Sequence, residues 1–344
     1  GMQQLETSCP PPAAGSGGVD ALVAYGQVVE ALQVVLLGDR LAAEYTALML
    51  ISHAGLNSAQ QNKVEGQNLC NAISDDAAAD IRITRLRAFL RDLLPRSTLV
   101  EVNIDSLNTD TLFVSKQAVG VGVAVGGERT DVSLLQLGAG TAVLLDESHM
   151  GEGVLQGNGL KNIRALKGIL NEQQLLVECN YYDIHIPTDV SAIIFSKVSS
   201  ILSTSTTIQL PLQALSTTAT STLSTQMHAD TDYMDVLDEE DLALYEDIVG
   251  SEEAIVRAHI TAMRQWWATS RSLPKPSMDA AVVQAAERDF LLAAAAVEEG
   301  QTTLPAVTSS VLHRWILTAQ LVALAEGASS VSIAHWGRMQ EMET

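Results

Sequence analysis

The sequence predicts an α/β fold in which a parallel sheet carries helices on both faces and is followed by an all-α unit. Short apolar runs that are typical of buried strands alternate with segments of helical periodicity up to residue 213. From residue 241 to residue 335 the pattern is helical, with a break at Pro274-Lys275-Pro276. The chain of 344 residues is 47% hydrophobic and 18% charged, which is typical of a folded protein with material for two globular units.

Four regions are expected along the chain. Residues 1–18 are rich in Pro, Gly and Ser and are predicted to be a flexible lead-in or, because the chain begins Gly1-Met2, the remnant of a removed tag, with a native N-terminal part missing. Residues 19–213 form the α/β domain, residues 214–240 an acidic Ser/Thr-rich linker, and residues 241–344 the helical C-terminal domain. The acidic run at 238–241 is expected to be a solvated linker and helix start, with a specific basic partner as the alternative.

The individual helices and strands are predicted from the periodicity of apolar residues and from the residues that end such elements. Helices are predicted over 19–53, with a break near Leu37-Gly38-Asp39, and over 77–94, 130–137 and 159–172. Strands are predicted over 97–105, 141–147, 191–197 and 206–212, with a hairpin formed by 174–179 and 184–187. Residues 54–68 are expected to form a polar loop, and the glycine-rich stretch 119–127 a loop or a loosened strand.

The charge balance excludes several kinds of partner. With a formal net charge of −21, the surface repels DNA, RNA and anionic lipid, so we expect protein or small-molecule partners and no membrane contact. Arg82, Arg85, Arg87 and Arg91 are expected to form a solvated helix face. Cys9, Cys70 and Cys179 are far apart and the histidines are scattered, which argues against a disulfide framework and a zinc site.

The strongest chemical signal is the segment TAVLLDE at 141–147. An apolar strand ending in Asp146-Glu147 has the Walker B pattern, in which the Asp holds Mg²⁺ through water and the Glu polarises the attacking water. The motif alone is weak, because buried strands ending in two acids are common. A working ATPase site also needs a phosphate-binding loop.

A phosphate-binding loop of the form GxxxxGK[ST] is absent, since the chain contains no Gly-Lys dipeptide. The stretch at 36–40 (LLGDR) resembles the opening of such a loop, but Ala42-Ala43-Glu44 follow, and an acid there repels phosphate. No GxSxG elbow is present either. Trp266, Trp267 and Trp315 are expected to be core residues rather than a ligand platform.

Five segments follow one another along the chain: LLGDRLAAEYTALMLIS at 36–52, the block at 142–196, TTIQLPLQ at 206–213, GQTTL at 300–304, and Arg314-Trp315 with Ala319-Gln320-Leu321. In this order they resemble the AAA+-like region of the MCM complex-binding protein family. Together they cover most of residues 36–325. The resemblance implies a degenerate AAA+-like, P-loop-like sheet related to the MCM helicase subunits.

The same resemblance assigns places to the nucleotide-handling parts. Asp146 and Glu147 stand at the Walker B position, and Ser196 at that of the helicase sensor residue, without the usual amide. Residues 68–76 stand at the phosphate loop without Gly or Lys, residues 174–187 at the pre-sensor hairpin, and residues 203–207 at the arginine finger without Arg. The resemblance therefore implies a pseudo-ATPase with no catalytic residues, no cofactor and no metal.

For function, the resemblance implies a nuclear, non-catalytic binding protein and chaperone of MCM2–7 helicase subunits, with MCM3 favoured. It would support MCM assembly and MCM removal from chromatin in DNA replication, with links to the cell cycle and sister chromatid cohesion. The alternatives are an AAA+-type ATPase with an unconventional phosphate loop, and a capsid-like assembly protein suggested by the Ala/Thr/Ser-rich acidic composition. The partner-binding residues are left unassigned.

Overall fold

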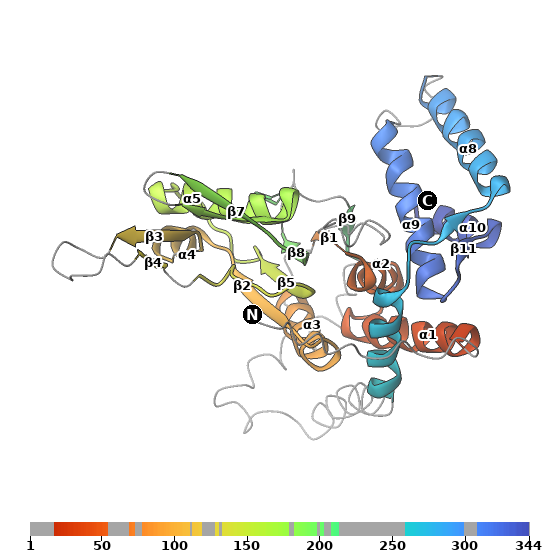
Figure 1. Cartoon of the computed structure of the whole chain (residues 1–344), viewed down its shortest axis with the longest axis horizontal. Coiled ribbons are helices and arrows are strands. Elements are labelled where there is room, and N and C mark those ends of the chain that lie inside the picture. Colours follow the sequence, from red (N-terminus) through yellow and green to blue (C-terminus); the bar gives the residue numbers. More distant parts are fainter. Residues whose placement is uncertain are drawn as a thin grey trace, which may run out of the picture.

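The computed structural model describes eleven stretches of the chain, and it is a mixed α/β structure (Figure 1). These stretches are residues 17–53, 69–72, 78–110, 112–118, 128–130, 133–178, 182–197, 200–202, 208–212, 259–298 and 308–343. The expectations for residues 1–16 of the lead-in, the loops 54–68 and 119–127, the linker, and the segments 203–207 and 300–304 lie outside the described residues, whereas Gly17 and Gly18 of the expected lead-in belong to a helix.

The described helices are α1 (Gly17–Val35), α2 (Arg40–Ile51), α3 (Ala78–Leu93), α4 (Ile104–Thr109), α5 (Gly157–Lys167) with a π-helical extension (Gly168–Glu172), α8 (Ala280–Glu298), α9 (Ser309–Ala325) and α10 (Ile333–Glu343). Another helical segment covers 259–272. The strands are β1 (Leu69–Ala72), β2 (Ser97–Glu101), β3 (Val114–Ala118), β4 (Glu128–Thr130), β5 (Thr141–Asp146), β6 (Gln174–Glu178), β7 (Asp183–Pro187), β8 (Val190–Ser196), β9 (Ile208–Pro211), β10 (Ser277–Met278) and β11 (Ser330–Val331).

The central sheet has five strands in the order β2-β5-β8-β1-β9, and every neighbouring pair is parallel. The predicted parallel sheet is therefore confirmed. The chain leaves β1 toward the β2 edge, returns strand by strand to β8, and then passes β1 to reach β9. The direction of winding thus reverses beside β1, which makes the β1–β8 boundary the topological switch point of the sheet.

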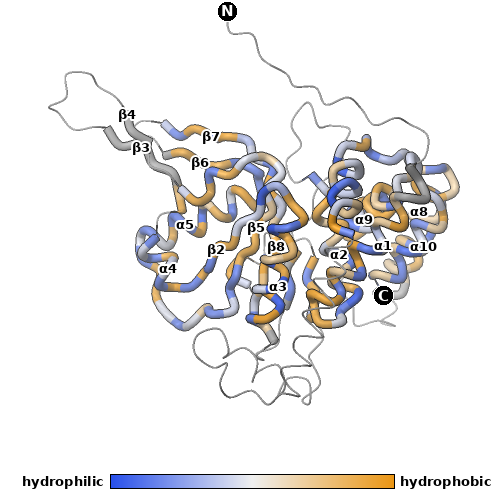
Figure 2. Tube along the Cα trace, turned by 90° about the horizontal axis from the view of Figure 1, so that it is seen from below, coloured by the Kyte–Doolittle hydropathy of each residue, from blue (hydrophilic) through white to orange (hydrophobic). Residues whose placement is uncertain are grey.

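Helices cover both faces of this sheet, as predicted, because successive side chains of each buried strand point to opposite sides. On one face, Leu144 and Phe195 join a core with α1, α2, α3 and α9. On the other face, Leu145 and Ile194 join a core with α4, α5 and its π-helical extension. In the view from below, α4 and α5 lie on one side of the strands and α2, α9 and α10 on the other (Figure 2).

The stretch LLGDR at 36–40 is a turn between two helices and not the start of a phosphate loop. Leu37 and Gly38 have positive φ angles of 59° and 95°, which ends α1 in a left-handed turn. Asp39 then accepts the backbone N–H of Ala42 at 3.0 Å and caps α2. The predicted break near residues 37–39 is confirmed, and its acid serves helix initiation.

A second sheet has the order β4-β3-β6-β7 and contains the confirmed hairpin of β6 and β7. This sheet shows that the predicted helix over 130–137 is wrong, since β4 ends at Thr130 and residues 133–137 form turns. The Ser133 hydroxyl donates to the carbonyl of Leu112 and accepts the N–H of Leu135 at 3.1 Å. These side-chain bonds compete with helical backbone bonds and hold Leu135 in the core.

The predicted strand over 97–105 is shorter than expected, because β2 ends at Glu101 and α4 begins at Ile104. Asn103 and Ser106 form a capping box, with the Asn103 side chain accepting the N–H of Ser106 at 2.7 Å. Residues 102–105, which belong to the predicted strand, therefore lead into helix α4, and the side chains of Asn103 and Ser106 set where this helix begins.

The helical C-terminal part shares a core with the sheet. Met263 and Trp266, from the segment 259–272, lie in the same cluster as Leu144 and Phe195. The all-α expectation needs one correction, because β10 and β11 form a two-residue parallel pairing between helices. The break at 274–276 is confirmed. The limits of the predicted linker stay a prediction, since residues 213–258 lie outside the described part. Within the described helices, none has the length and hydropathy that a bilayer crossing requires.

Candidate functional site at the carboxyl edge of the sheet

The carboxyl ends of β1, β5 and β8 meet at the switch point of the sheet. Ala72, the last residue of β1, pairs with Ser196, and Asp146 pairs with Phe195. The N–H of Glu147 donates to the carbonyl of Phe195 at 2.8 Å. The fold therefore brings Asp146, Glu147 and Ser196 together with the end of β1. The expectation that residues 68–76 stand at the phosphate loop needs a correction, because residues 69–72 form the strand β1 itself, and residues 68 and 73–76 lie outside the described part.

Glu147 is buried, with 2% of its surface exposed. Burial raises the pKa of its carboxyl group above the ordinary value, the nearby charge of Asp146 raises it slightly further, and hydrogen bonds from Ser196, Ser200 and the backbone of Ile201 oppose the shift. Its Oε1 atom makes no hydrogen bond within the described chain. The Glu147 carboxyl group thus faces hydroxyl groups of the protein, in surroundings that favour its neutral form.

Asp146 is engaged by its own turn. Its Oδ1 accepts the backbone N–H of Ser148 at 2.8 Å and the Ser148 hydroxyl at 2.5 Å. The Ser148 hydroxyl also lies 2.9 Å from Nδ1 of His149, whose Nε2 lies 3.7 Å from Asp80 at the start of α3. Both of these last side chains are largely solvent-exposed, so their pairing contributes little. Asp146 therefore shapes the turn that follows β5.

Arg82 corrects the expectation of a solvated arginine face on α3. It is fully buried, whereas Arg87 and Arg91 are exposed and Arg85 is half-buried. Residue 82 lies four positions before Leu86, on the inward stripe of the helix, which explains its burial. Sequence reasoning missed it because four arginines at short spacing look like one polar surface.

Asn71 is a second buried polar residue at this edge. It lies in β1 with none of its surface exposed, and neither its Oδ1 nor its Nδ2 has a hydrogen-bond partner among the described residues. A central strand rarely buries an amide in this way. The buried amide of Asn71 near the end of β1 shows that this edge of the sheet contains buried polar groups as well as apolar side chains.

Both carboxyl groups of the Asp146-Glu147 pair contact the protein itself. Glu147 is buried, and Oδ1 of Asp146 accepts the Ser148 hydroxyl. In the stretches that the structure describes, no group of three or more His, Cys, Asp or Glu side chains could hold a metal ion. The described part of the edge is suited to holding three strand ends together.

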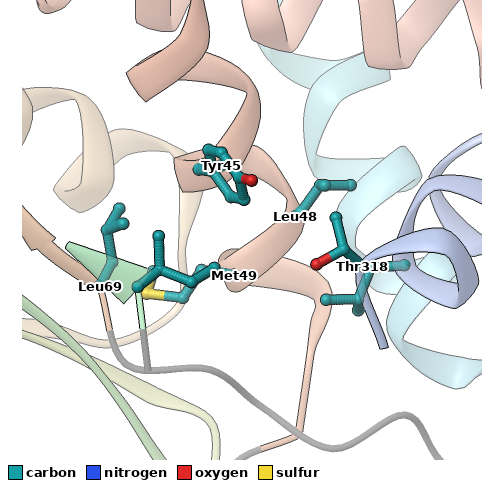
Figure 3. A pocket seen from close by; sticks show the side chains of 7 residues that line it. Tyr45, Leu48, Met49, Leu69 and Thr318 are labelled. Atoms are coloured by element: carbon teal, nitrogen blue, oxygen red, sulfur yellow. The ribbon is translucent and has the colours of Figure 1, made fainter. Parts of the chain in front are cut away.

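A small cavity lies between α2, β1 and α9, and Figure 3 shows Tyr45, Leu48, Met49, Leu69 and Thr318 around it. Its volume of about 10 Å³ is close to the minimum for one water molecule and too small for a ligand. The cavity is a packing gap where the helical part meets the sheet. Of the three tryptophans expected in the core, Trp266 is buried and donates its Nε1–H to the carbonyl of Ala325 at 2.8 Å, whereas Trp267 and Trp315 are half-buried.

Comparison with known proteins places the chain in a family. Residues 23–344 match the family described as "Mini-chromosome maintenance replisome factor". A Gallus gallus protein named "Mini-chromosome maintenance complex-binding protein" is 24% identical over 308 residues, which is 90% of this chain and 42% of the relative. An Arabidopsis thaliana protein of the same name is 26% identical over 310 residues, covering 90% of this chain and 44% of the relative.

A Drosophila melanogaster protein of that name is 31% identical over 172 residues, which is 50% of this chain and 27% of the relative. The chain therefore spans less than half the length of the curated relatives that it matches. The match to the family covers both the sheet and the helical C-terminal part. This chain belongs to the mini-chromosome maintenance replisome factor family.

Proposed function

We propose that this chain is part of a protein that binds the MCM complex and that it does so without hydrolysing nucleotide. The support for binding is the family match over residues 23–344, together with relatives whose names describe binding to that complex. The single structural observation that supports a non-catalytic role is the burial of Glu147 against Ser196 and Ser200.

A degenerate AAA+-like fold belongs to the same proposal. An ATPase site on a parallel sheet needs the phosphate-loop strand, the acid-bearing strand and the sensor strand to end side by side. The order β5-β8-β1 and the pairing of Ala72 with Ser196 supply that arrangement. A body with the outline of a helicase subunit could use the surfaces through which such subunits contact one another.

The partner is tested by co-purification. The chain, purified alone, is mixed with each MCM subunit in turn, and the longer protein that contains it serves as the positive control. We expect retention of at least one subunit, with MCM3 favoured. If the longer protein retains subunits and this chain retains none, the binding surface lies elsewhere in the protein and the proposal for this chain is wrong.

The ATPase alternative is tested by a thermal shift with Mg-ATP. A ligand at about a hundredfold excess over its Kd stabilises a folded protein by about 2.7 kcal/mol, so binding is easily seen. We expect no shift and no phosphate release. Turnover that is abolished by Glu147→Gln would instead support the alternative and refute the pseudo-ATPase assignment.

Chaperoning of newly made subunits, MCM assembly, MCM removal from chromatin and nuclear localisation are further parts of the proposal. They are tested in cells with a fluorescent fusion of the whole protein and with chromatin fractionation after its depletion. We expect nuclear fluorescence and a changed amount of chromatin-bound MCM. A purely cytoplasmic signal would contradict the nuclear assignment, and an unchanged amount of bound MCM would contradict the chromatin role.

A further inference from the structure

A pocket of about 340 Å³ lies at the amino edge of the central sheet, opposite the edge that carries Asp146. Its walls come from the residues that precede three strands and from the helical segment 259–272. The lining residues are Pro95, Arg96, Ala139, Gly140, Asp189, Trp267 and Arg271. Its volume is in the range of pockets that hold small molecules or a few side chains.

One wall of the pocket is rigid and electrically balanced. Nη2 of Arg271 lies 2.7 Å from Oδ2 of Asp189, with 11% and 4% of the two side chains exposed. Nη1 of Arg271 also donates to the carbonyl of Ser52, and the guanidinium lies 5.9 Å from the ring centre of Trp267. A buried pair with this many additional bonds holds its geometry, so Arg271 and Asp189 together add no net charge to the pocket.

Arg96 is the charged residue of the pocket lining that is not part of the Arg271–Asp189 pair. Its side chain is exposed, and its guanidinium has no carboxylate or carbonyl partner among the residues that the structure describes. Its backbone is held, because its carbonyl accepts the N–H of Ala142 at the start of β5 at 3.2 Å. The pocket therefore carries one excess positive charge in a chain whose net charge is −21.

The absence of a side chain at Gly138 leaves room for the guanidinium group of Arg96. A Cβ atom on Gly138 would overlap Nη1 of Arg96, so the guanidinium rests directly on the backbone of residue 138. A Cβ on Gly140 would likewise contact the Arg271 guanidinium, at 3.7 Å from Nη2. The guanidinium groups of both arginines therefore lie close to the backbone of the two glycines before β5.

We propose that this pocket binds a carboxylate side chain of an acidic segment in a partner protein, with Arg96 as its ligand. A guanidinium presents two parallel N–H donors that match a carboxylate, and one excess positive charge matches a monoanion better than a dianionic phosphate. Pro95 and Trp267 provide apolar contacts for a neighbouring side chain of the segment. Because the Debye length is about 8 Å at physiological ionic strength, local charge outweighs the distant negative surface.

The test uses a fluorescein-labelled peptide of alternating aspartate and phenylalanine, with an otherwise identical asparagine peptide as the matched ligand. Binding to the purified chain is measured by fluorescence anisotropy for the wild type, Arg96→Ala, Gly138→Ala and the control Arg87→Ala. Arg87 is an exposed arginine of α3 that does not line the pocket. Thermal unfolding of each variant checks that the fold is retained.

We expect the aspartate peptide to bind about two- to fivefold more tightly than the asparagine peptide, because the pair that its carboxylate forms with the exposed Arg96 is in the range of exposed ion pairs. Arg96→Ala should weaken its binding by about the same factor, and Gly138→Ala should weaken it by displacing the guanidinium while Arg96 remains. Arg87→Ala should leave the affinity unchanged. Equal binding of the two peptides, or wild-type affinity in Arg96→Ala, would overturn the proposal.

A competition experiment distinguishes a carboxylate ligand from a phosphate ligand. Sodium acetate should displace the aspartate peptide at lower concentration than inorganic phosphate does at the same ionic strength. If phosphate is the better competitor, the pocket is a phosphate site and the assignment to a carboxylate is wrong. The pocket is independent of the carboxyl edge, so this outcome leaves the proposed MCM binding untouched.

Discussion

Replacing Thr318 with valine should stabilise the protein. Thr318 lies in α9 with 1% of its surface exposed, beside the cavity of Figure 3, and its hydroxyl has no hydrogen-bond partner among the described residues. A buried polar group without a partner costs about 1 to 3 kcal/mol. Valine keeps the β-branched shape, removes the hydroxyl and adds a methyl group worth about 0.8 kcal/mol when buried.

The expected gain is therefore about 1 to 2 kcal/mol, since part of the valine methyl contact is already made by the hydroxyl. For a chain of this length the gain corresponds to a rise in Tm of about 1.5 to 3 °C. The assay is urea unfolding followed by circular dichroism, with the midpoint compared at constant slope. Differential scanning calorimetry provides an independent Tm.

Thr46→Val is the matched control. Thr46 is a fully buried helix threonine like Thr318, but its hydroxyl donates to the carbonyl of Ala42 at 2.7 Å. Its replacement loses a made hydrogen bond and should destabilise the protein by up to about 1 kcal/mol. A Thr318→Val variant that is no more stable than the wild type would mean that the Thr318 hydroxyl is satisfied, for example by a buried water, and would refute the prediction. A Thr46→Val variant that is also stabilised would mean that the hydrogen bond of Thr46 does not distinguish the two sites.

Three further substitutions test other parts of the structure by the same unfolding assay. Glu147→Gln replaces a carboxyl group whose pKa is raised in the folded protein by a neutral amide. At pH values between the ordinary and the raised pKa, the folded wild type binds more protons than the unfolded chain. The free energy of unfolding of the wild type therefore falls as the pH rises through this range. The gain of the variant should thus be small near pH 4.5 and larger at pH 7.5, by about 1.4 kcal/mol for each unit of raised pKa, and a pH-independent difference would contradict this. Asn162→Ala should destabilise by about 3 kcal/mol or more, because the buried amide makes four backbone bonds that hold the segment between α4 and β3, and a loss below about 1 kcal/mol would show that these bonds are replaceable. Arg271→Ala should cost about 3 to 5 kcal/mol, because it leaves Asp189 buried without its guanidinium partner, and the double variant Arg271→Ala with Asp189→Asn should recover part of that loss.

The elements that sequence predicted well are those whose pattern is local and one-sided. Continuous apolar runs made β5 and β8 recognisable as central strands, because both of their faces are buried. Asp39, following a glycine, marked the start of α2 through a cap that involves only three residues. In each of these elements the decisive interaction lies within a few positions of the residue concerned.

The elements that sequence missed depend on distant partners. β3 (Val114–Ala118) has the polar sequence VSKQA and is a strand because Val114 pairs with Val177 of β6. Residues 133–137 have leucines at helical spacing, yet the Ser133 hydroxyl bonds to Leu112 and prevents a helix. The pocket of Arg96 is invisible in the sequence, because its walls come from segments that meet only in the folded chain.

The carboxyl edge shows the same limit for function. An apolar strand followed by Asp146-Glu147 predicts where the two carboxylates lie along the chain, and in the structure the register with β8 brings them beside Ser196. The orientation of Glu147 is a different matter, because it depends on Ser200 and Ile201, which belong to the turn after another strand. Burial raises the pKa of the Glu147 carboxyl group and favours its neutral form, whereas a glutamate that polarises an attacking water acts in its ionised form. The Walker B pattern indicates a nucleotide site by its position, whereas the absence of the phosphate-loop residues indicates that nucleotide is not hydrolysed. The burial of Glu147 is the physical reason to propose that the motif, too, is non-catalytic.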